Sequence, residues 1–293
     1  MARKHYTFDE TSLLDGFGLS ASHCDFGADD TPPHTHDFHE LVVVVSGAGI
    51  HHFNGERFKI AAGNVFLVTP GQEHAYFNRD RLEIYNVFFQ EDILAPYRHE
   101  FEQISGFHLL FNLVPHMSIE KRASGNLSIP RARLAEAVAL AQGIQRELVR
   151  GEPGCRVTAT CDFLQLLMLI SRECLASDSQ HYHHAQQISR VLSFIEGHYP
   201  EPLSLDDLAK PANLSVSAFR RAFGEVVGVS PIKYLLNFRL QKAAERLRAG
   251  AGALSETAFA CGFNDSNYFS VQFHRFFGIA PLKYRQRFAP ARK

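Results

Sequence analysis

The sequence predicts a multi-domain α+β protein, with an N-terminal antiparallel β-barrel and helical pair followed by an all-α domain of two helix-turn-helix motifs. Three observations support this fold class. The 293 residues exceed the usual size of one domain. Strand-like runs separated by turns fill residues 17–89, whereas helical periodicity dominates after Pro130. Finally, the C-terminal part repeats one residue pattern twice.

The N-terminal part alternates apolar runs with turn signals. Residues 41–45 are a β-branched run, and the glycines in residues 46–49 predict a turn after it. Asn54-Gly55 is the strongest short hairpin signal and precedes a run of alternating polarity. Strands separated by tight turns indicate an antiparallel sandwich or small barrel. The expected strands include residues 41–45, 57–60, 65–68 and 84–89.

Apolar residues at helical spacing predict two helices between Pro130 and Ala176, with a break at residues 151–154. The pair could cover the barrel or meet a second subunit, and we expect it to mediate a homodimer. Residues 177–184 are polar and are a plausible linker. The predicted domains are therefore residues 1–180 and 187–293.

The net charge of −1 is unevenly distributed along the chain. From Gln187 to the end, 15 Lys and Arg stand against 8 Asp and Glu, a net charge of +7. The remaining residues hold 15 basic and 23 acidic side chains, a net charge of −8. Only the C-terminal half is therefore expected to bind a polyanion.

The composition excludes several other classes of protein. No apolar run approaches the roughly 20 residues of a membrane span, and the first residues show no secretory signal. The five cysteines are scattered and include no CxxC pair, which argues against a disulfide framework or a cysteine zinc site. We expect a cytoplasmic protein with no membrane partner.

Six residue pairs of an internal repeat share a constant offset of 50 residues, whereas the part before them matches one residue out of step. Each copy contains a short helix with a small alanine, then Asn213 or Gly262 where the backbone can turn left-handed. A second helix follows Ser215 or Asp265, both acceptable N-caps. One helix over residues 232–249, about 27 Å long, joins the copies and can hold them about one DNA turn apart. The matched pairs are Phe219 and Phe269, Phe223 and Phe273, Gly228 and Gly278, Pro231 and Pro281, Lys233 and Lys283, and Tyr234 and Tyr284.

Phenylalanines at i and i+4 pack one face of each second helix inward, which leaves the opposite face free for DNA. Arg, Asn and Ser suit base edges or phosphates in the major groove. A helical domain whose Phe and Gly merely pack would explain the phenylalanines, but not the constant offset together with the positive charge. The predicted DNA-binding residues on these faces are Ser217, Arg220 and Arg221 in the first copy, and Asn267, Ser270 and His274 in the second.

The stretch SPIKYLLNFRLQKAAERL, with ACGFNDSNYFSVQFHRFFGIAPLKYR after it, resembles the signature of the AraC/XylS family of transcriptional regulators. The resemblance covers about residues 187–288. It implies a two-motif domain that binds promoter DNA and activates transcription beside RNA polymerase. Two residues depart from the family pattern: Pro211 falls in a region that is commonly helical, and Val271 stands where many members have arginine.

Four side chains suggest a site in the N-terminal domain. His34 and His36 share one face of a strand, and Glu40 keeps the same parity if the strand continues. His74 could complete a set that suits Zn, Fe, Mn or Ni. Their order resembles the cupin motifs. The four residues either bind a divalent metal or line a polar pocket for a small effector, unless they are ordinary surface or core histidines. We expect an effector, and no cofactor.

A finer similarity links HTHDFHELVVVVSGAGIHHFNG and GFNDSNYFS to activators of L-rhamnose operons. It implies base reading by Asp265 and Asn267, and a sugar as the effector. We therefore expect an activator of sugar-catabolism genes and no catalytic residues. The rival hypothesis is a metal-dependent cupin enzyme fused to a DNA-binding domain, although no separate acid–base pair stands out.

Overall fold

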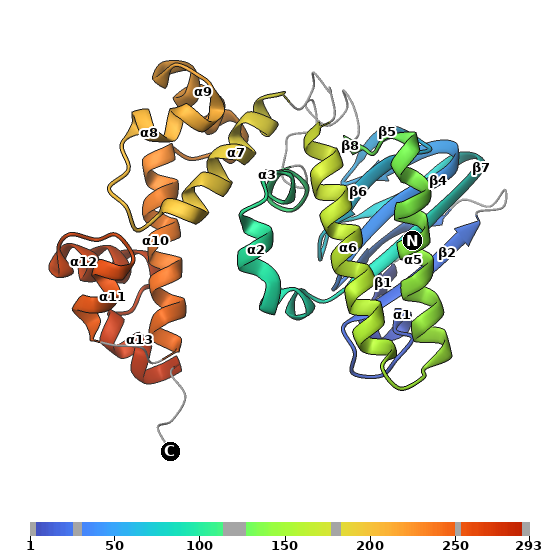
Figure 1. Cartoon of the computed structure of the whole chain (residues 1–293), viewed down its shortest axis with the longest axis horizontal. Coiled ribbons are helices and arrows are strands. Elements are labelled where there is room, and N and C mark those ends of the chain that lie inside the picture. Colours follow the sequence, from blue (N-terminus) through green and yellow to red (C-terminus); the bar gives the residue numbers. More distant parts are fainter. Residues whose placement is uncertain (1–3, 26–30, 114–126, 177–182, 250–252, 289–293) are drawn as a thin grey trace. The chain divides into compact units, whose positions relative to one another are not determined.

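A computed structural model describes residues 4–25, 31–113, 127–176, 183–249 and 253–288 (Figure 1). The chain divides into two compact units, Met1–Ser189 and Arg190–Lys293, each with its own core. The expected α+β class is confirmed, with a sheet in the N-terminal unit and only helices in the described part of the C-terminal unit. The domain limits 1–180 and 187–293 stay predictions.

The N-terminal unit is built on an eight-stranded sheet in the order β1-β3-β7-β4-β6-β8, in which β2 also pairs with β7 and β5 with β4. The pairing is antiparallel except between β1 and β3, which run parallel. The strands are β1 (Lys4–Tyr6), β2 (Leu19–Asp25), β3 (Thr31–His36), β4 (His39–Phe53), β5 (Glu56–Ala61), β6 (Asn64–Val68), β7 (His74–Phe89) and β8 (Leu127–Ser128).

The turn predicted at residues 46–49 is wrong, because β4 runs through them as one strand of 15 residues. Its register against β7 shifts three times between Val44 and Ile50, so the small residues form an irregular, bulged segment. Gly47 has a φ of 72° and lies so close to the backbone of Arg81 that a Cβ would overlap it. Glycine here permits a close approach of two strands and does not end one.

The Asn54-Gly55 hairpin is confirmed. Both residues have positive φ, 48° and 90°, as a type I′ turn requires. The chain also bends at Asp37 and Phe38 between β3 and β4, so the strand that was expected to continue from His34 to Glu40 is interrupted.

Two long helices, α5 (Arg131–Arg150) and α6 (Cys155–Ala176), lie over one face of the sheet (Figure 1). They pack against each other, and α5 also contacts β2, β4 and β7. The break predicted at residues 151–154 is confirmed, since Gly151 ends α5 with a φ of 63°. Short helices complete the unit: α1 (Phe8–Thr11), η1 (Glu91–Ile93), η2 (Ala95–Tyr97), α2 (Arg98–Glu102), α3 (Ser105–Phe107) and η3 (His108–Leu113).

The C-terminal unit is helical throughout the part that the structure describes. Helix α7 begins at His183, so the linker predicted over 177–184 is wrong for its last two residues, while 177–182 lie outside the described residues. These two residues, His183 and His184, are exposed in the first turn of the helix. Helix α7 (His183–His198) crosses the boundary between the two units. The helices after it are α8 (Leu205–Ala209), η6 (Lys210–Ala212), α9 (Val216–Val227), α10 (Pro231–Arg248), α11 (Leu254–Ala260), α12 (Ser266–Phe277) and α13 (Pro281–Phe288).

The local signals of both helix-turn-helix motifs are confirmed. Asn213 and Gly262 turn with φ of 54° and 80°, and the side chains of Ser215 and Asp265 cap α9 and α12. Pro211 lies in η6, and α8 before it is only five residues long, because proline disfavours continuation of an α-helix. No described helix is both long and apolar enough to cross a membrane.

Candidate functional site

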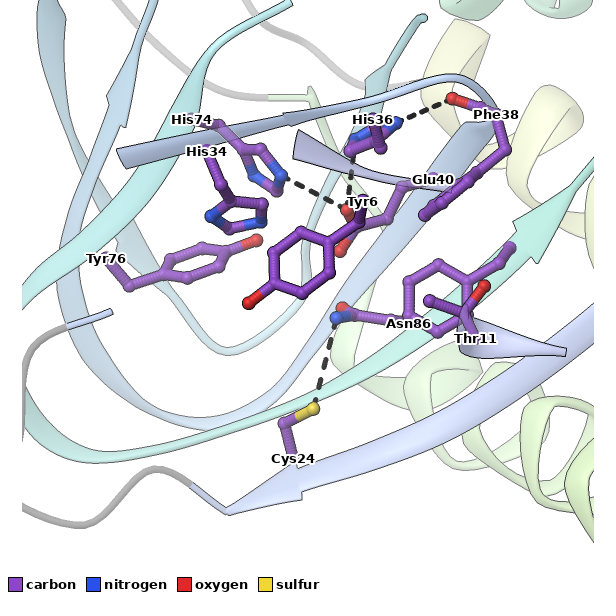
Figure 2. A pocket seen from close by; sticks show the side chains of 11 residues that line it. Tyr6, Thr11, Cys24, His34, His36, Phe38, Glu40, His74, Tyr76 and Asn86 are labelled. Atoms are coloured by element: carbon purple, nitrogen blue, oxygen red, sulfur yellow. Dashed lines mark hydrogen bonds and ion pairs between the residues drawn. The ribbon is translucent and has the colours of Figure 1, made fainter. Parts of the chain in front are cut away.

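The four predicted side chains of the N-terminal unit converge in space, although three strands carry them (Figure 2). His34 and His74 are direct cross-strand partners of β3 and β7. Glu40 lies near the start of β4, where its Oε2 is 3.3 Å from His36 Nε2 and 3.2 Å from His74 Nε2. One potential ligand atom from each of His34, Glu40 and His74 lies within 4.8 Å of the other two.

Backbone carbonyls hold two of the imidazole rings. His36 Nδ1 is 2.7 Å from the carbonyl of Phe38, and His34 Nδ1 is 3.0 Å from that of Pro32. These contacts direct the Nε2 atoms away from the backbone. His74 Nδ1 is buried and makes no hydrogen bond within the described part of the chain, whereas the buried Nε2 atoms of His36 and His74 face the Glu40 carboxylate. A buried polar atom without a hydrogen bond is a position where a ligand or ion can gain a contact.

The site stabilises a negative charge on Glu40. Burial by itself would raise the pKa of this carboxyl, but His74 and His36 outweigh burial and hold the pKa well below its usual range. Burial, and secondarily His74, lowers the pKa of His34 to about 4. At neutral pH the site therefore contains an ionised carboxylate beside a neutral His34.

These side chains form one wall of a cavity of about 180 Å³. The residues of the other cavity walls were not predicted from the sequence. The alternation of β7 places Tyr76 on the same face as His74, a signal that was present in the sequence. Asn86 and Phe88 lie near the other end of this 16-residue strand. Nothing in the sequence marked Tyr6 or Thr11. The lining residues are Tyr6, Thr11, Cys24, His34, His36, Phe38, Glu40, His74, Tyr76, Asn86 and Phe88.

In the first motif of the C-terminal unit, α9 presents the predicted side chains as expected from its period. Phe219 and Phe223 are completely buried, whereas Ser217, Arg220 and Arg221 are exposed. The N-cap at Ser215 and the left-handed Gly228 define the ends of the helix. The exposed face therefore carries two adjacent arginines.

In the second motif, the predicted residues of α12 divide into two groups. Asn267 and His274 are exposed. The hydroxyl of Ser270 is half-buried and donates to the carbonyl of Ser266 at 2.8 Å, so it is engaged within the helix. The carboxylate of Asp265 accepts from the backbone N–H of Tyr268 as the N-cap. Asn267 and His274 are thus less engaged in hydrogen bonds within the helix than Ser270 and Asp265 are.

Comparison with known proteins gives matches for both units. Residues 17–196 match the AraC-like ligand binding domain, and residues 208–287 match a helix-turn-helix domain. The chain is 32% identical, over 88% of either chain, to proteins named HTH-type transcriptional activator RhaS from Shigella boydii serotype 18 and Escherichia coli O139:H28. A transcriptional regulator of known structure from Chromobacterium violaceum is 30% identical and covers 36% of this chain and 95% of its own, with a TM-score of 0.34.

Proposed function

Because the chain belongs to the AraC family of transcriptional regulators, we propose that it activates sugar-catabolism genes in response to a small molecule bound in the N-terminal unit. The C-terminal unit is the helix-turn-helix domain that binds promoter DNA. The effector half of the proposal rests on the buried Glu40 and its three neighbouring histidines at the cavity. The ligand would act by binding one conformation of the protein better than another.

The cavity favours a small, neutral, polyhydroxylated ligand. Its volume of about 180 Å³ lies below the range of about 300–1,000 Å³ typical of pockets for drug-sized ligands. No Lys or Arg is among the described residues that line it, so an anionic ligand would meet the Glu40 carboxylate without a compensating cation. Glu40 and the buried Oδ1 of Asn86 can accept hydrogen bonds from hydroxyl groups, while Phe38 and Phe88 offer apolar faces to ring C–H groups.

L-Rhamnose is the first sugar to test, because the sequence resembles activators of L-rhamnose operons. We would measure the melting temperature of the full-length protein with a panel of neutral monosaccharides, sugar phosphates and hydroxy acids. A neutral monosaccharide is expected to stabilise the protein, by about 2.7 kcal/mol at a hundred times its Kd. Stabilisation by the anionic compounds alone would contradict this proposal.

The convergent ligand atoms favour one second candidate, a divalent metal held by His34, Glu40 and His74. His36, the fourth residue of the predicted set, is not part of this group, although its Nε2 lies 3.3 Å from Glu40 Oε2. The separation of 3.2 Å between Glu40 Oε2 and His74 Nε2 is that expected of two ligands sharing an ion at about 2.0–2.2 Å. The backbone contact that orients His34 fits the same role. Such an ion would supply a Lewis acid to a bound hydroxyl or carbonyl, as in the rival hypothesis of a metal-dependent enzyme fused to a DNA-binding domain.

Elemental analysis of the purified full-length protein separates the two candidates. A stoichiometric metal that is lost in His74→Ala but kept in the control His99→Ala, a histidine exposed on α2, would favour the metal centre. Metal-free protein that still binds a monosaccharide would leave the cavity as an organic effector site.

For DNA recognition, we propose that α9 and α12 enter successive major grooves. Helix α10 joins the two motifs, and its 18 residues correspond to a length of about 27 Å. The candidate contacts are Ser217, Arg220 and Arg221 on α9, and Asp265, Asn267, Ser270 and His274 on α12. Footprinting on promoter DNA should show two protected major grooves about one helical turn apart.

We also propose that the protein acts in the cytoplasm as a homodimer and contacts RNA polymerase. Val149 and Val157, on α5 and α6 near their connection, are 66% and 68% exposed, and such side chains suit contact with a second subunit. Sedimentation of the wild type and of a Val149→Ser/Val157→Ser variant tests the dimer. Equal dimer fractions in the wild type and the variant would show that Val149 and Val157 are not part of the dimer interface.

A further inference from the structure

The outer face of α12 has an exposed apolar centre. Val271 is 63% exposed and Tyr268 is 51% exposed. The other face of α12 carries the completely buried Phe269 and Phe273, so the core of this motif is filled without Val271. At the matching position of α9, 50 residues earlier, the exposed side chain is Arg221. The same scaffold therefore presents an arginine in one motif and a valine in the other.

Polar side chains flank Val271 along the helix. Asn267 lies one turn before it and His274 almost one turn after it, so the three share one face. The hydroxyl of Ser270, next to Val271, already donates to the carbonyl of Ser266. The middle of the face thus offers a branched apolar side chain, with an amide on one side and an imidazole on the other.

Two chemical features of the major groove fit this arrangement. The C5-methyl group of thymine is the apolar group at a base edge, and small apolar side chains contact it. An asparagine amide makes two hydrogen bonds with the N6 and N7 of adenine. We propose that Val271 reads the methyl group of a thymine next to an adenine that Asn267 reads, so that α12 selects adjacent A·T base pairs. The inference rests on the proposed role of α12 as a reading helix.

The test begins with a binding site selected by the full-length protein from a random duplex pool. The half-site read by α12 is the one whose sequence preference Asn267→Ala relaxes. Each thymine of that half-site is then replaced singly by deoxyuridine, which removes only the methyl group. For the wild type, one replacement is expected to weaken binding about fourfold, the effect of one methyl group left in water.

Variants of Val271 link the effect to this side chain. Val271→Ser should bind the thymine site more weakly than the wild type does. Its affinity should not fall further when the sensitive thymine is replaced by deoxyuridine. Val271→Thr keeps one methyl group, so this replacement should lower its affinity by an intermediate factor. The matched control is Val229→Ser, the same change at a valine 37% exposed between α9 and α10. This control should show the full fourfold response.

Three results would overturn the inference. The first is a wild type that tolerates every single deoxyuridine replacement in the half-site. The second is a full fourfold response in Val271→Ser, which would mean that another group reads the methyl or that Val271 meets a protein partner instead. The third is an unchanged selected sequence for Asn267→Ala, which would remove α12 as a reading helix and overturn the underlying proposal as well.

Discussion

His74 Nε2 lies 3.2 Å from Glu40 Oε2, although the two residues are 34 positions apart and belong to different strands. Both side chains are almost completely buried. Strand β7 begins at His74, where it pairs with the end of β4 at Phe53, while Glu40 near the start of β4 pairs with the other end of β7 at Phe88. The contact therefore depends on the curvature of two long paired strands.

Replacing Glu40 by Gln should weaken effector binding by about 1.5–3 kcal/mol, the value of a hydrogen bond to a charged group. The change keeps the size of the side chain and removes the charge that faces His36 and His74. Calorimetric titration with the stabilising monosaccharide measures the loss. Glu83→Gln, at a partly exposed glutamate of the same sheet, is the control and should bind as the wild type does. If Glu40→Gln bound the effector as tightly as the wild type does, the carboxylate would not take part in effector binding.

The protein should lose stability as the pH falls from about 6.5 towards 4. The pKa of His34 falls from 6.5 in the unfolded chain to about 4 in the folded protein, because burial disfavours its charged form. Burial also lowers the pKa of His39. Between these pH values the unfolded chain binds more protons than the folded one, so protonation favours unfolding. Urea denaturation at pH 7, 6 and 5 tests this, and His34→Gln should reduce the slope. An identical slope in that variant would contradict the assignment.

Arg220→Ala and Arg221→Ala should each weaken binding to promoter DNA by about 1–3 kcal/mol if the arginine contacts a base. Loss of a phosphate contact would instead reduce the salt dependence of binding by about one unit of slope. Gel-shift titrations at several salt concentrations distinguish the two effects. Arg57→Ala, at an exposed arginine of β5 in the other unit, should change neither quantity. If the double variant Arg220→Ala/Arg221→Ala kept both the affinity and the salt dependence of the wild type, α9 would be excluded as the first reading helix.

Gly262→Ala should destabilise the second helix-turn-helix motif by more than the roughly 1–2 kcal/mol that a left-handed backbone costs alanine. With a φ of 80°, a Cβ at this position would lie 2.7 Å from the carbonyl oxygen of Tyr199 and 2.8 Å from Arg239 Nε. Gly278→Ala is the matched control, because its φ of 72° is similar but no atom lies within 4 Å of the added carbon. Thermal unfolding of both variants measures the difference. Equal effects would show that backbone strain alone requires glycine at 262.

The C-terminal domain was predicted in detail because its signals are local. The caps at Ser215 and Asp265, the left-handed Asn213 and Gly262, and the i, i+4 phenylalanines all act within one or two helical turns. A constant offset of 50 residues then identified the two copies. The same local reasoning failed at Ser46–Gly49, because whether small residues end a strand or form a bulge depends on the partner strand β7.

Patterns within the sequence predicted the two-domain organisation, the paired helix-turn-helix motifs and the four polar residues of the candidate N-terminal site. The folded structure was needed to show that Glu40 contacts both His36 and His74, and that Tyr6, Asn86 and Phe88 complete the cavity. It also shows that Val271 is exposed, while the hydroxyl of Ser270 donates to the carbonyl of Ser266. The physical reason is the range of the interactions: helix caps and helical faces follow from neighbouring residues, whereas a cavity wall depends on the register of strands far apart in the chain.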